Sequence, residues 1–126
     1  MNQKQTLLLG ALLGALGVAL GAFGAHALKN LLIKNGRLET YELAVRYHFY
    51  HALALLLIGL LMSQYGSVMM GWSSLSIFTG VILFSGRLYL FSLTNTTVYA
   101  MITPIGGLFL LGGWVLLFYA IFAKRS

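Results

Sequence analysis

The sequence predicts an all-α, polytopic membrane protein: a bundle of four transmembrane helices, with a short amphipathic segment at the membrane interface between helices 1 and 2. Residues 47–123 contain one fully charged side chain, that of Arg87, and residues 5–28 contain none. Because a helix needs about 20 mostly apolar residues to cross the hydrocarbon core, these two runs are long enough for about four crossings.

The composition supports the same fold class. Hydrophobic residues make up 60% of the chain and charged residues 8%, which leaves too little polar surface to cover a water-soluble globule. Cysteine is absent, so the chain has no disulfides, thiolate metal ligands or cysteine nucleophiles. We predict one small transmembrane domain over residues 1–126.

The first crossing is expected at about residues 6–27. Its glycines recur at steps of three and four, which puts them on one face of a helix. In lipid, small residues allow helix backbones to approach closely, so this face predicts helix packing. The glycines are Gly10, Gly14, Gly17, Gly21 and Gly24.

A signal peptide is the alternative interpretation of this segment. Lys4, the apolar stretch and Ala25-His26-Ala27 resemble its basic start, its core and its small-residue cleavage site. Signal cores are about 7–15 residues long, however, and this apolar stretch exceeds 20. We therefore expect the segment to be retained as a transmembrane helix.

The only long polar stretch separates the first two crossings, over residues 28–46. Its leucines suggest a short amphipathic helix lying in the interface, and Asn35-Gly36 predicts a turn after it. The second crossing is expected at about residues 42–62.

Two further crossings follow at short intervals, at about residues 72–93 and about residues 99–122. Pro104 lies in the first turns of the last helix, where its missing N–H group costs least. Gly106 and Gly107 offer further close helix contacts.

In a four-crossing bundle, the connection between helices 1 and 2 lies on the same side of the membrane as the connection between helices 3 and 4. This topology brings most polar residues to one membrane face. Ionisable groups within membrane segments are costly to bury and by default indicate a functional site. The candidate ligand-binding or polar-cluster residues are His26, Glu42, Arg46, His48, His51, Arg87, Tyr89 and Thr103.

Arg87 has two possible roles. It is deep enough in the third helix to need a partner, yet shallow enough for its side chain to reach the interface. Glu39 or Glu42 is a possible counter-charge within a structural ion-pair network, while Glu42 and Arg46 have the spacing of a pair along one helix. The other role is a cation that binds a ligand.

The three histidines also have several interpretations. His48 and His51 share a helix face, and His26 from the first helix would complete a three-imidazole zinc or copper site. Haem ligation and proton relay are further possibilities. Buried histidines also often bond a backbone carbonyl, and no carboxylate-rich metal motif accompanies these three. We predict no cofactor.

The sequence offers little support for an enzyme. Ser85 beside Gly86, with His51 as a base, fits no nucleophile elbow, and serine and glycine are ordinary packing residues in membrane helices. No phosphate-binding glycine loop is present. We therefore expect a protein that is not an enzyme.

The formal net charge of +6 comes from cations that flank membrane segments, which favours anionic lipid headgroups as partners and not nucleic acid. Five cations lie on or near the polar face, whereas the other face has three, Lys4, Lys124 and Arg125. This imbalance predicts that the connection over residues 28–46 is cytoplasmic.

Several motifs resemble one known family. Gly21-Ala-Phe-Gly-Ala-His-Ala-Leu28, Tyr47-His-Phe-Tyr-His-Ala-Leu-Ala-Leu55, Phe84-Ser-Gly-Arg-Leu-Tyr89 and Ile102-Thr-Pro-Ile-Gly-Gly107, with Gly113-Trp114, are similar to those of the domain of unknown function 423 family, also called uncharacterised protein family 0382. The resemblance implies a small bacterial inner-membrane protein of four helices and implies no activity.

The resemblance also ranks the candidate residues. The shared motifs include His26, His51, Tyr89, Thr103 and Pro104. The resemblance implies that glutamine often occupies the position of His48, which argues against a three-histidine metal site. It implies a small hydroxyl residue at the position of Arg87, so a function that needs this arginine would belong to this protein.

We favour a non-enzymatic membrane bundle that forms homo-oligomers through glycine-rich faces and binds a lipid, small molecule or partner at the polar face. The alternative is a transporter or channel for a small solute, ion or proton, using His26, His51 and Glu42. A haem- or metal-binding protein is the third possibility.

Overall fold

The computed structural model describes residues 1–124, which fold into helices without any strand. These are α1 (Gln3–Ala25), α2 (Lys29–Asn35), α3 (Leu38–Tyr65), α4 (Val68–Thr94) and α5 (Ile102–Ala123). All but α2 are long and apolar enough to cross a membrane. The prediction of an all-α protein with four crossings is therefore confirmed. Arg125, counted above as a cation of the chain's end, lies outside the described residues.

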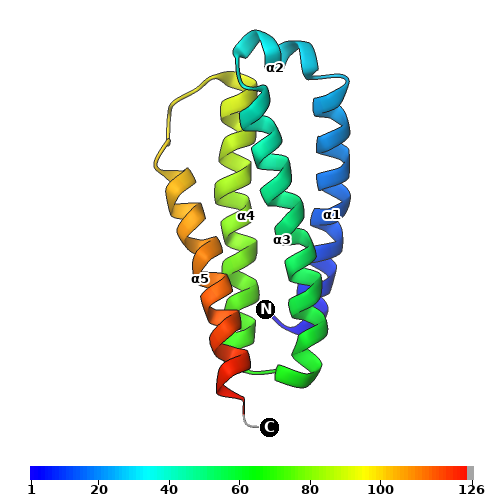
Figure 1. Cartoon of the computed structure of the whole chain (residues 1–126), viewed down its shortest axis with the longest axis vertical. Coiled ribbons are helices and arrows are strands. Elements are labelled where there is room, and N and C mark those ends of the chain that lie inside the picture. Colours follow the sequence, from blue (N-terminus) through cyan, green and yellow to red (C-terminus); the bar gives the residue numbers. More distant parts are fainter. Residues whose placement is uncertain (125–126) are drawn as a thin grey trace.

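The long helices form a row rather than a closed ring. α1 packs along α3, α3 along α4, and α4 along α5, as Figure 1 shows. Among the described residues, α1 and α5 make no contact with each other. The two outer helices are therefore less buried than α3 and α4, and they offer more side-chain surface to lipid.

α2 lies across one end of this row (Figure 1). Leu32 is fully buried against the bundle, while Leu31 and Ile33 remain exposed. The helix ends at Gly36, whose φ of 67° lies in the left-handed region that glycine adopts without steric cost. The predicted interfacial segment is thus a seven-residue helix.

Local caps explain why two helices begin earlier than predicted. Asn2 Oδ1 accepts a hydrogen bond from Gln5 N at 2.8 Å, and Gln5 Oε1 accepts one from Asn2 N at 3.2 Å, so α1 begins with a capping box. Ser67 Oγ accepts a hydrogen bond from Met70 N at 3.2 Å and caps α4. Both capping residues lie outside the predicted crossings, at residues 6–27 and 72–93.

The ends of α3 and the start of α5 also differ from the predicted bounds. α3 runs from Leu38 to Tyr65 and so continues beyond the predicted crossing on both sides, because polar residues can be helical outside the hydrocarbon core. α5 begins at Ile102, later than predicted. Before it, Asn95 and Tyr99 have φ values of 55° and 62°, which turn the chain and delay the helix.

Glycines of α1 form the seam with α3. A Cβ atom on Gly10 would lie 3.1 Å from Leu56, and one on Gly17 would lie 3.0 Å from Phe49. A Cβ atom on Gly24 would collide with the ring of Tyr41. Small residues at these three positions therefore allow the two helices to approach each other closely.

The remaining two glycines of the α1 face have more space. Nothing lies within 4 Å of a Cβ atom built on Gly14, and one on Gly21 would lie 3.4 Å from Val45. On α5, a Cβ atom on Gly106 would collide with the backbone of Phe84, whereas Gly107 has only ordinary contacts. The α4–α5 seam thus depends more on Gly106 than on its neighbour.

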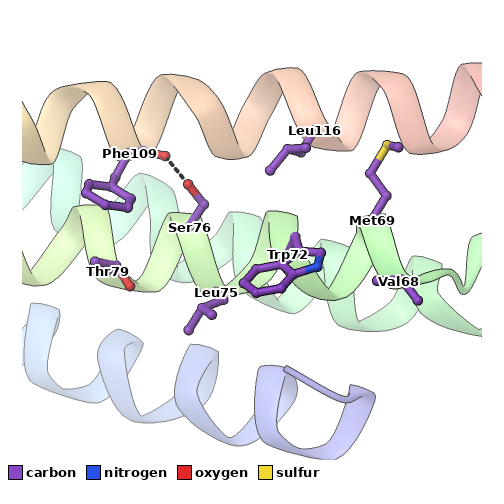
Figure 2. A pocket seen from close by; sticks show the side chains of 8 residues that line it. All are labelled: Val68, Met69, Trp72, Leu75, Ser76, Thr79, Phe109 and Leu116. Atoms are coloured by element: carbon purple, nitrogen blue, oxygen red, sulfur yellow. Dashed lines mark hydrogen bonds between the residues drawn. The ribbon is translucent and has the colours of Figure 1, made fainter.

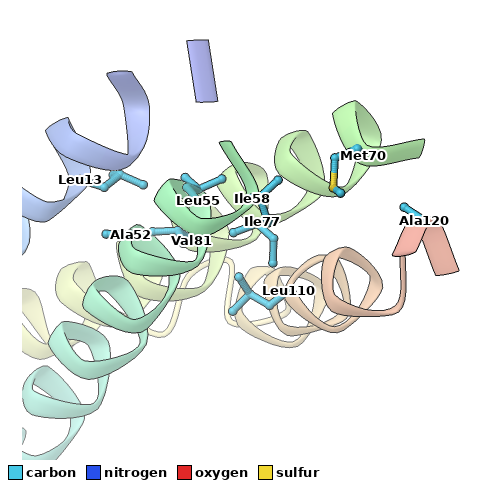
Figure 3. Close-up of a cluster of buried hydrophobic side chains, with 9 residues drawn as sticks. All are labelled: Leu13, Ala52, Leu55, Ile58, Met70, Ile77, Val81, Leu110 and Ala120. Atoms are coloured by element: carbon cyan, nitrogen blue, oxygen red, sulfur yellow. The ribbon is translucent and has the colours of Figure 1, made fainter. Parts of the chain in front are cut away.

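Apolar side chains from all four long helices meet in one core, drawn in Figure 3. Its members are Leu13, Ala52, Leu55, Ile58, Met70, Ile77, Val81, Leu110 and Ala120. Many other large apolar side chains are exposed on the outer faces of the helices. This distribution suits a protein whose outer solvent is lipid.

Serine hydroxyl groups join neighbouring helices inside the bundle. Ser73 Oγ donates to Gly113 O at 2.7 Å, and Ser85 Oγ donates to Ala44 O at 2.9 Å. Every fully buried side-chain nitrogen and oxygen among the described residues has a hydrogen-bond partner. In lipid this is the expected state, because no water is available to satisfy such groups.

Candidate functional site

The predicted polar residues lie toward the end of the bundle that carries α2, which we call the polar end: α2, the start of α3, the end of α4, the α4–α5 loop and the start of α5. Asn35 Nδ2 donates to Ser92 O at 3.1 Å and to Leu93 O at 3.3 Å. These bonds attach the end of α2 to the last turn of α4, so two connections that are distant in sequence form one structure.

The structure does not gather the candidate residues into one cluster. His26 is the exposed C-cap residue of α1. Glu42 and Arg46 line a separate pocket of about 240 Å³ between α1 and α3, together with Tyr41 and Val45. The other candidates fall into three further groups.

The first of these groups is His48 with Tyr89. His48 is buried, its Nε2 lies 2.7 Å from Leu13 O, and its Nδ1 lies 2.8 Å from the Tyr89 hydroxyl. Since a carbonyl can only accept, Nε2 carries a proton, and in the neutral imidazole Nδ1 accepts from Tyr89. The imidazole thereby joins α1, α3 and α4.

The second group is His51 with Trp114. His51 Nδ1 lies 2.7 Å from Tyr47 O, one turn earlier in α3, and therefore donates to it. Trp114 Nε1 donates to His51 Nε2 at 3.0 Å. An indole nitrogen can only donate, so this contact requires a neutral imidazole. The sequence analysis named Trp114 only as part of a shared motif, and nothing in its spacing identified His51 as its partner.

These contacts bear on the metal hypothesis. His48 and His51 use both ring nitrogens within the chain, and His26 lies at the end of another helix. Among the described residues, no group of three or more histidine, cysteine, aspartate or glutamate side chains could hold a metal ion. The three histidines therefore do not form the candidate zinc or copper site.

The third group surrounds Arg87, whose side chain is only 6% exposed. Its Nε donates to Tyr99 O at 3.2 Å, and its Nη2 donates to Thr96 O at 3.0 Å. The observed partners of Arg87 are thus backbone carbonyls of the α4–α5 loop, and not the predicted counter-charge, Glu39 or Glu42. Arg87 lies seven residues before the end of α4, about 10 Å at 1.5 Å per residue, and its long side chain reaches that loop.

Beside Arg87 lies a pocket of about 200 Å³, which we call the Arg87 pocket. Residues of α4, the loop and α5 line it, and Thr103 is the candidate that α5 contributes. Its lining residues are Arg87, Leu88, Phe91, Thr97, Ala100 and Thr103.

Arg37 is a second cation at this place that the sequence analysis did not single out. Its Cζ lies 4.4 Å from the centroid of the Phe91 ring, and that of Arg87 lies 5.5 Å from the same centroid. Arg37 Nε also donates to Asn95 Oδ1 at 3.1 Å. Only the docking of α2 on α4 brings Arg37 here, which sequence spacing alone does not reveal.

A larger groove of about 520 Å³ opens between α4 and α5 near the opposite end (Figure 2). Its walls are mainly apolar, and Ser76 Oγ donates to Phe109 O across the seam at 2.6 Å. Its lining residues are Val68, Met69, Trp72, Leu75, Ser76, Thr79, Phe109 and Leu116. It suits contact with acyl chains and brings together no groups for chemistry.

Four apolar spans, lipid-facing outer surfaces and internally satisfied polar groups define a small multi-pass integral membrane protein. The chain belongs to the family described as Protein of unknown function (DUF423), whose family model matches residues 20–107. The matched segment includes every candidate residue of the polar end, from His26 to Thr103. The family resemblance stated from the motifs is confirmed.

Curated relatives cover nearly the whole chain. The UPF0382 membrane protein SAB0533 of Staphylococcus aureus is 44% identical over 94% of this chain and 96% of its own length. The UPF0382 membrane protein YwdK of Bacillus subtilis is 40% identical over 93% and 95%. The UPF0382 inner membrane protein YgdD of Escherichia coli K12 is 37% identical over 100% and 96%.

No solved structure matches this chain. The relatives' names and the four candidate spans agree with the predicted location, a multi-pass protein of the bacterial inner membrane.

Proposed function

We propose that this protein is a non-catalytic membrane protein that binds an anionic ligand at its polar end, with Arg87 as the anchor. One observation carries the proposal: a nearly buried guanidinium group has two carbonyl partners and lines a pocket. Carbonyl groups satisfy N–H donors but do not neutralise the charge. Burying such a charge is costly unless an opposite charge accompanies it.

The hydrogen bonds around the candidate catalytic groups favour binding over catalysis. The Ser85 hydroxyl donates to Ala44 O, and both ring nitrogens of His51 are bonded within the chain. A nucleophile requires a nearby base with a free nitrogen. Neither residue offers this arrangement.

The same contacts make His51 a poor member of a proton relay. Its Nε2 already accepts from Trp114, and a second proton there would set two donors against each other. Transport stays the alternative function. Proton flux into liposomes that depends on pH and is abolished by His51→Ala would favour it over binding.

We also propose that the polar end is cytoplasmic and that the protein self-associates. Among the described residues, the polar end carries four cations besides Arg87, while the opposite end carries Lys4 and Lys124. Cytoplasmic loops carry an excess of cations. For self-association, the open space above Gly14 allows the backbone of a second helix to approach.

Native mass spectrometry of protein extracted gently from its own membrane tests the binding proposal. We expect the wild type to carry a stoichiometric anionic ligand and the Arg87→Gln variant to lose it. Arg46→Gln is the matched control, because it removes an exposed cation from the same end but outside the Arg87 pocket. Wild-type protein without any ligand, or equal retention in Arg87→Gln, would refute the proposal.

A further inference from the structure

We infer that the Arg87 pocket binds a phosphate group, specifically that of an anionic phospholipid headgroup. The inference rests on the proposed function and names its ligand class. It depends on the charge balance, the size and lining of the pocket, and its depth in the membrane.

The charge balance begins with the hydrogen bonds of Arg87. A guanidinium group has five N–H donors, and the observed bonds use Nε and Nη2. Nη1 bonds no described protein atom, and it is not fully buried, because every fully buried side-chain nitrogen has a partner. Arg87 therefore keeps donors available for an anion in the adjoining pocket.

A second positive charge lies close by. Arg37 and Arg87 both contact the Phe91 ring, so their charges lie within about 10 Å, which is the Debye length at roughly 0.1 M salt. Their hydrogen bonds go to the side-chain amide of Asn95 and to backbone carbonyls, all of which are neutral. An anion in the Arg87 pocket would reduce the repulsion between the two cations.

Helix dipoles only partly change this balance. The carbonyl end of α4 carries roughly half a negative charge, which offsets a fraction of two full positive charges. The Arg87 pocket also includes Thr103, in the first turn of α5, where the N–H end of the helix carries roughly half a positive charge. The two partial charges oppose each other, so they leave the charges of Arg87 and Arg37 largely unchanged.

The pocket has the size and the donors that a phosphate group needs. Its volume of about 200 Å³ is several times the roughly 30 Å³ that one water molecule occupies in the liquid. Thr97 and Thr103 contribute hydroxyl groups that can donate to phosphate oxygens. Arginine is well suited to phosphate, because its planar fork of donors can bind two oxygens at once.

The position of the pocket favours a lipid as the source of the phosphate. Arg87 lies about 10 Å from the end of a membrane-spanning helix. The loop beside it exposes more than half of the surface of Val98, Tyr99 and Met101. Apolar and aromatic side chains with this exposure belong at the level of headgroups and upper acyl chains. A lipid phosphate is already at that level.

The test compares two lipids with the same acyl chains. Delipidated full-length protein is titrated with phosphatidylglycerol and, separately, with phosphatidylcholine, and bound lipid is counted by native mass spectrometry. We expect the wild type to prefer the anionic lipid by about tenfold, because the choline cation cancels the charge of its own phosphate and would be repelled by the nearby guanidinium groups. Arg87→Gln should abolish this preference, and Arg46→Gln should retain it.

Two milder variants keep the test decisive if Arg87→Gln does not fold. Arg37→Gln removes the second charge, and Thr103→Val removes a hydroxyl group while keeping the side-chain shape. Each should lower the preference about threefold. No preference in the wild type, or no change in any of the variants Arg87→Gln, Arg37→Gln and Thr103→Val, would overturn the lipid assignment.

Inorganic phosphate separates the possible sources. If phosphate binds in an Arg87-dependent way while the two lipids bind equally, the ligand is a soluble phosphate compound and the lipid assignment is wrong. If the ligand lost by Arg87→Gln from native membranes carries a carboxylate and no phosphate, this inference fails while the proposed function stands. Loss of phosphatidylglycerol itself would support both.

Discussion

His48 and His51 lie three residues apart on α3, yet their side chains bond different helices. His48 bonds α1 and α4 through Leu13 and Tyr89, whereas His51 bonds α5 through Trp114. In a soluble protein, water could replace any of these bonds. In lipid a lost partner leaves a polar group unsatisfied, so both imidazoles stabilise helix packing.

Substitution of His48 tests this role. Glutamine can donate to Leu13 O through its amide nitrogen and accept from Tyr89 through its oxygen, so His48→Gln should keep nearly full stability. His48→Leu leaves the Tyr89 hydroxyl without its acceptor and should lower the free energy of unfolding by about 1 kcal/mol. Reversible unfolding in mixed detergent micelles measures both.

Tyr89→Phe is the control, because it removes the same hydrogen bond from the other side. Combined with His48→Leu, it should cost little more than His48→Leu alone, because that change already removes this bond. Fully additive losses would mean that the two side chains do not stabilise each other.

At the residue scale, the sequence predicted which side chains are special but not which ones meet. Arg87 stood out as the only full charge in its run, and it is nearly buried. Its partners are backbone carbonyls, which no sequence pattern marks. Arg37 was missed because its place depends on how α2 docks, and this is a long-range contact.

At the scale of helices, the glycine pattern of α1 separates into two sets with different neighbours. Gly10, Gly17 and Gly24 face α3 at close range, while Gly14 faces open space. The period of three and four residues predicted one face, and a helix face is broad enough to hold both sets. Which glycines contact a neighbour depends on the rotation of α1 about its axis, and the spacing does not specify this rotation.

Leucine substitutions distinguish the two sets. Gly24→Leu should clash with the Tyr41 ring and lower the stability of the monomer by about 1–3 kcal/mol. Gly14→Leu should change that stability by less than about 0.5 kcal/mol and should weaken self-association. Thermal unfolding reports the first effect, and native mass spectrometry of the oligomer reports the second.

Each of these two predictions can be contradicted by one result. Normal folding of Gly24→Leu would contradict the close α1–α3 seam. An unchanged oligomer size in Gly14→Leu would argue against assembly through this face of α1.

At the scale of the whole molecule, the number of crossings followed from the apolar runs, because the bilayer sets the helix length. The order of the helices in space did not follow from the apolar runs, because any apolar helix face can pack against another helix in lipid. In the structure, the helices form a row in which each long helix packs along the next long helix in the chain. At the polar end, the connection between α1 and α3, which contains α2, lies on the same side as the connection between α4 and α5.

Membrane orientation can be measured directly because the chain has no cysteine. Asn30→Cys introduces a label site on exposed α2, and Ser63→Cys introduces one near the opposite end. We expect a membrane-impermeant maleimide added to intact spheroplasts to label Ser63→Cys alone, and both variants after permeabilisation, because the cation-rich end should be cytoplasmic. The reverse pattern would show that the polar end faces outward.

The row of helices also has a consequence for the order in which the protein assembles during synthesis. Because every long helix after the first packs along the long helix before it, each new crossing meets a partner as soon as it enters the bilayer. A closed ring would instead have to wait for its last helix before its first helix could be covered. Contacts between consecutive segments form quickly. We therefore expect the α1–α3 pair to form before α5 has left the ribosome.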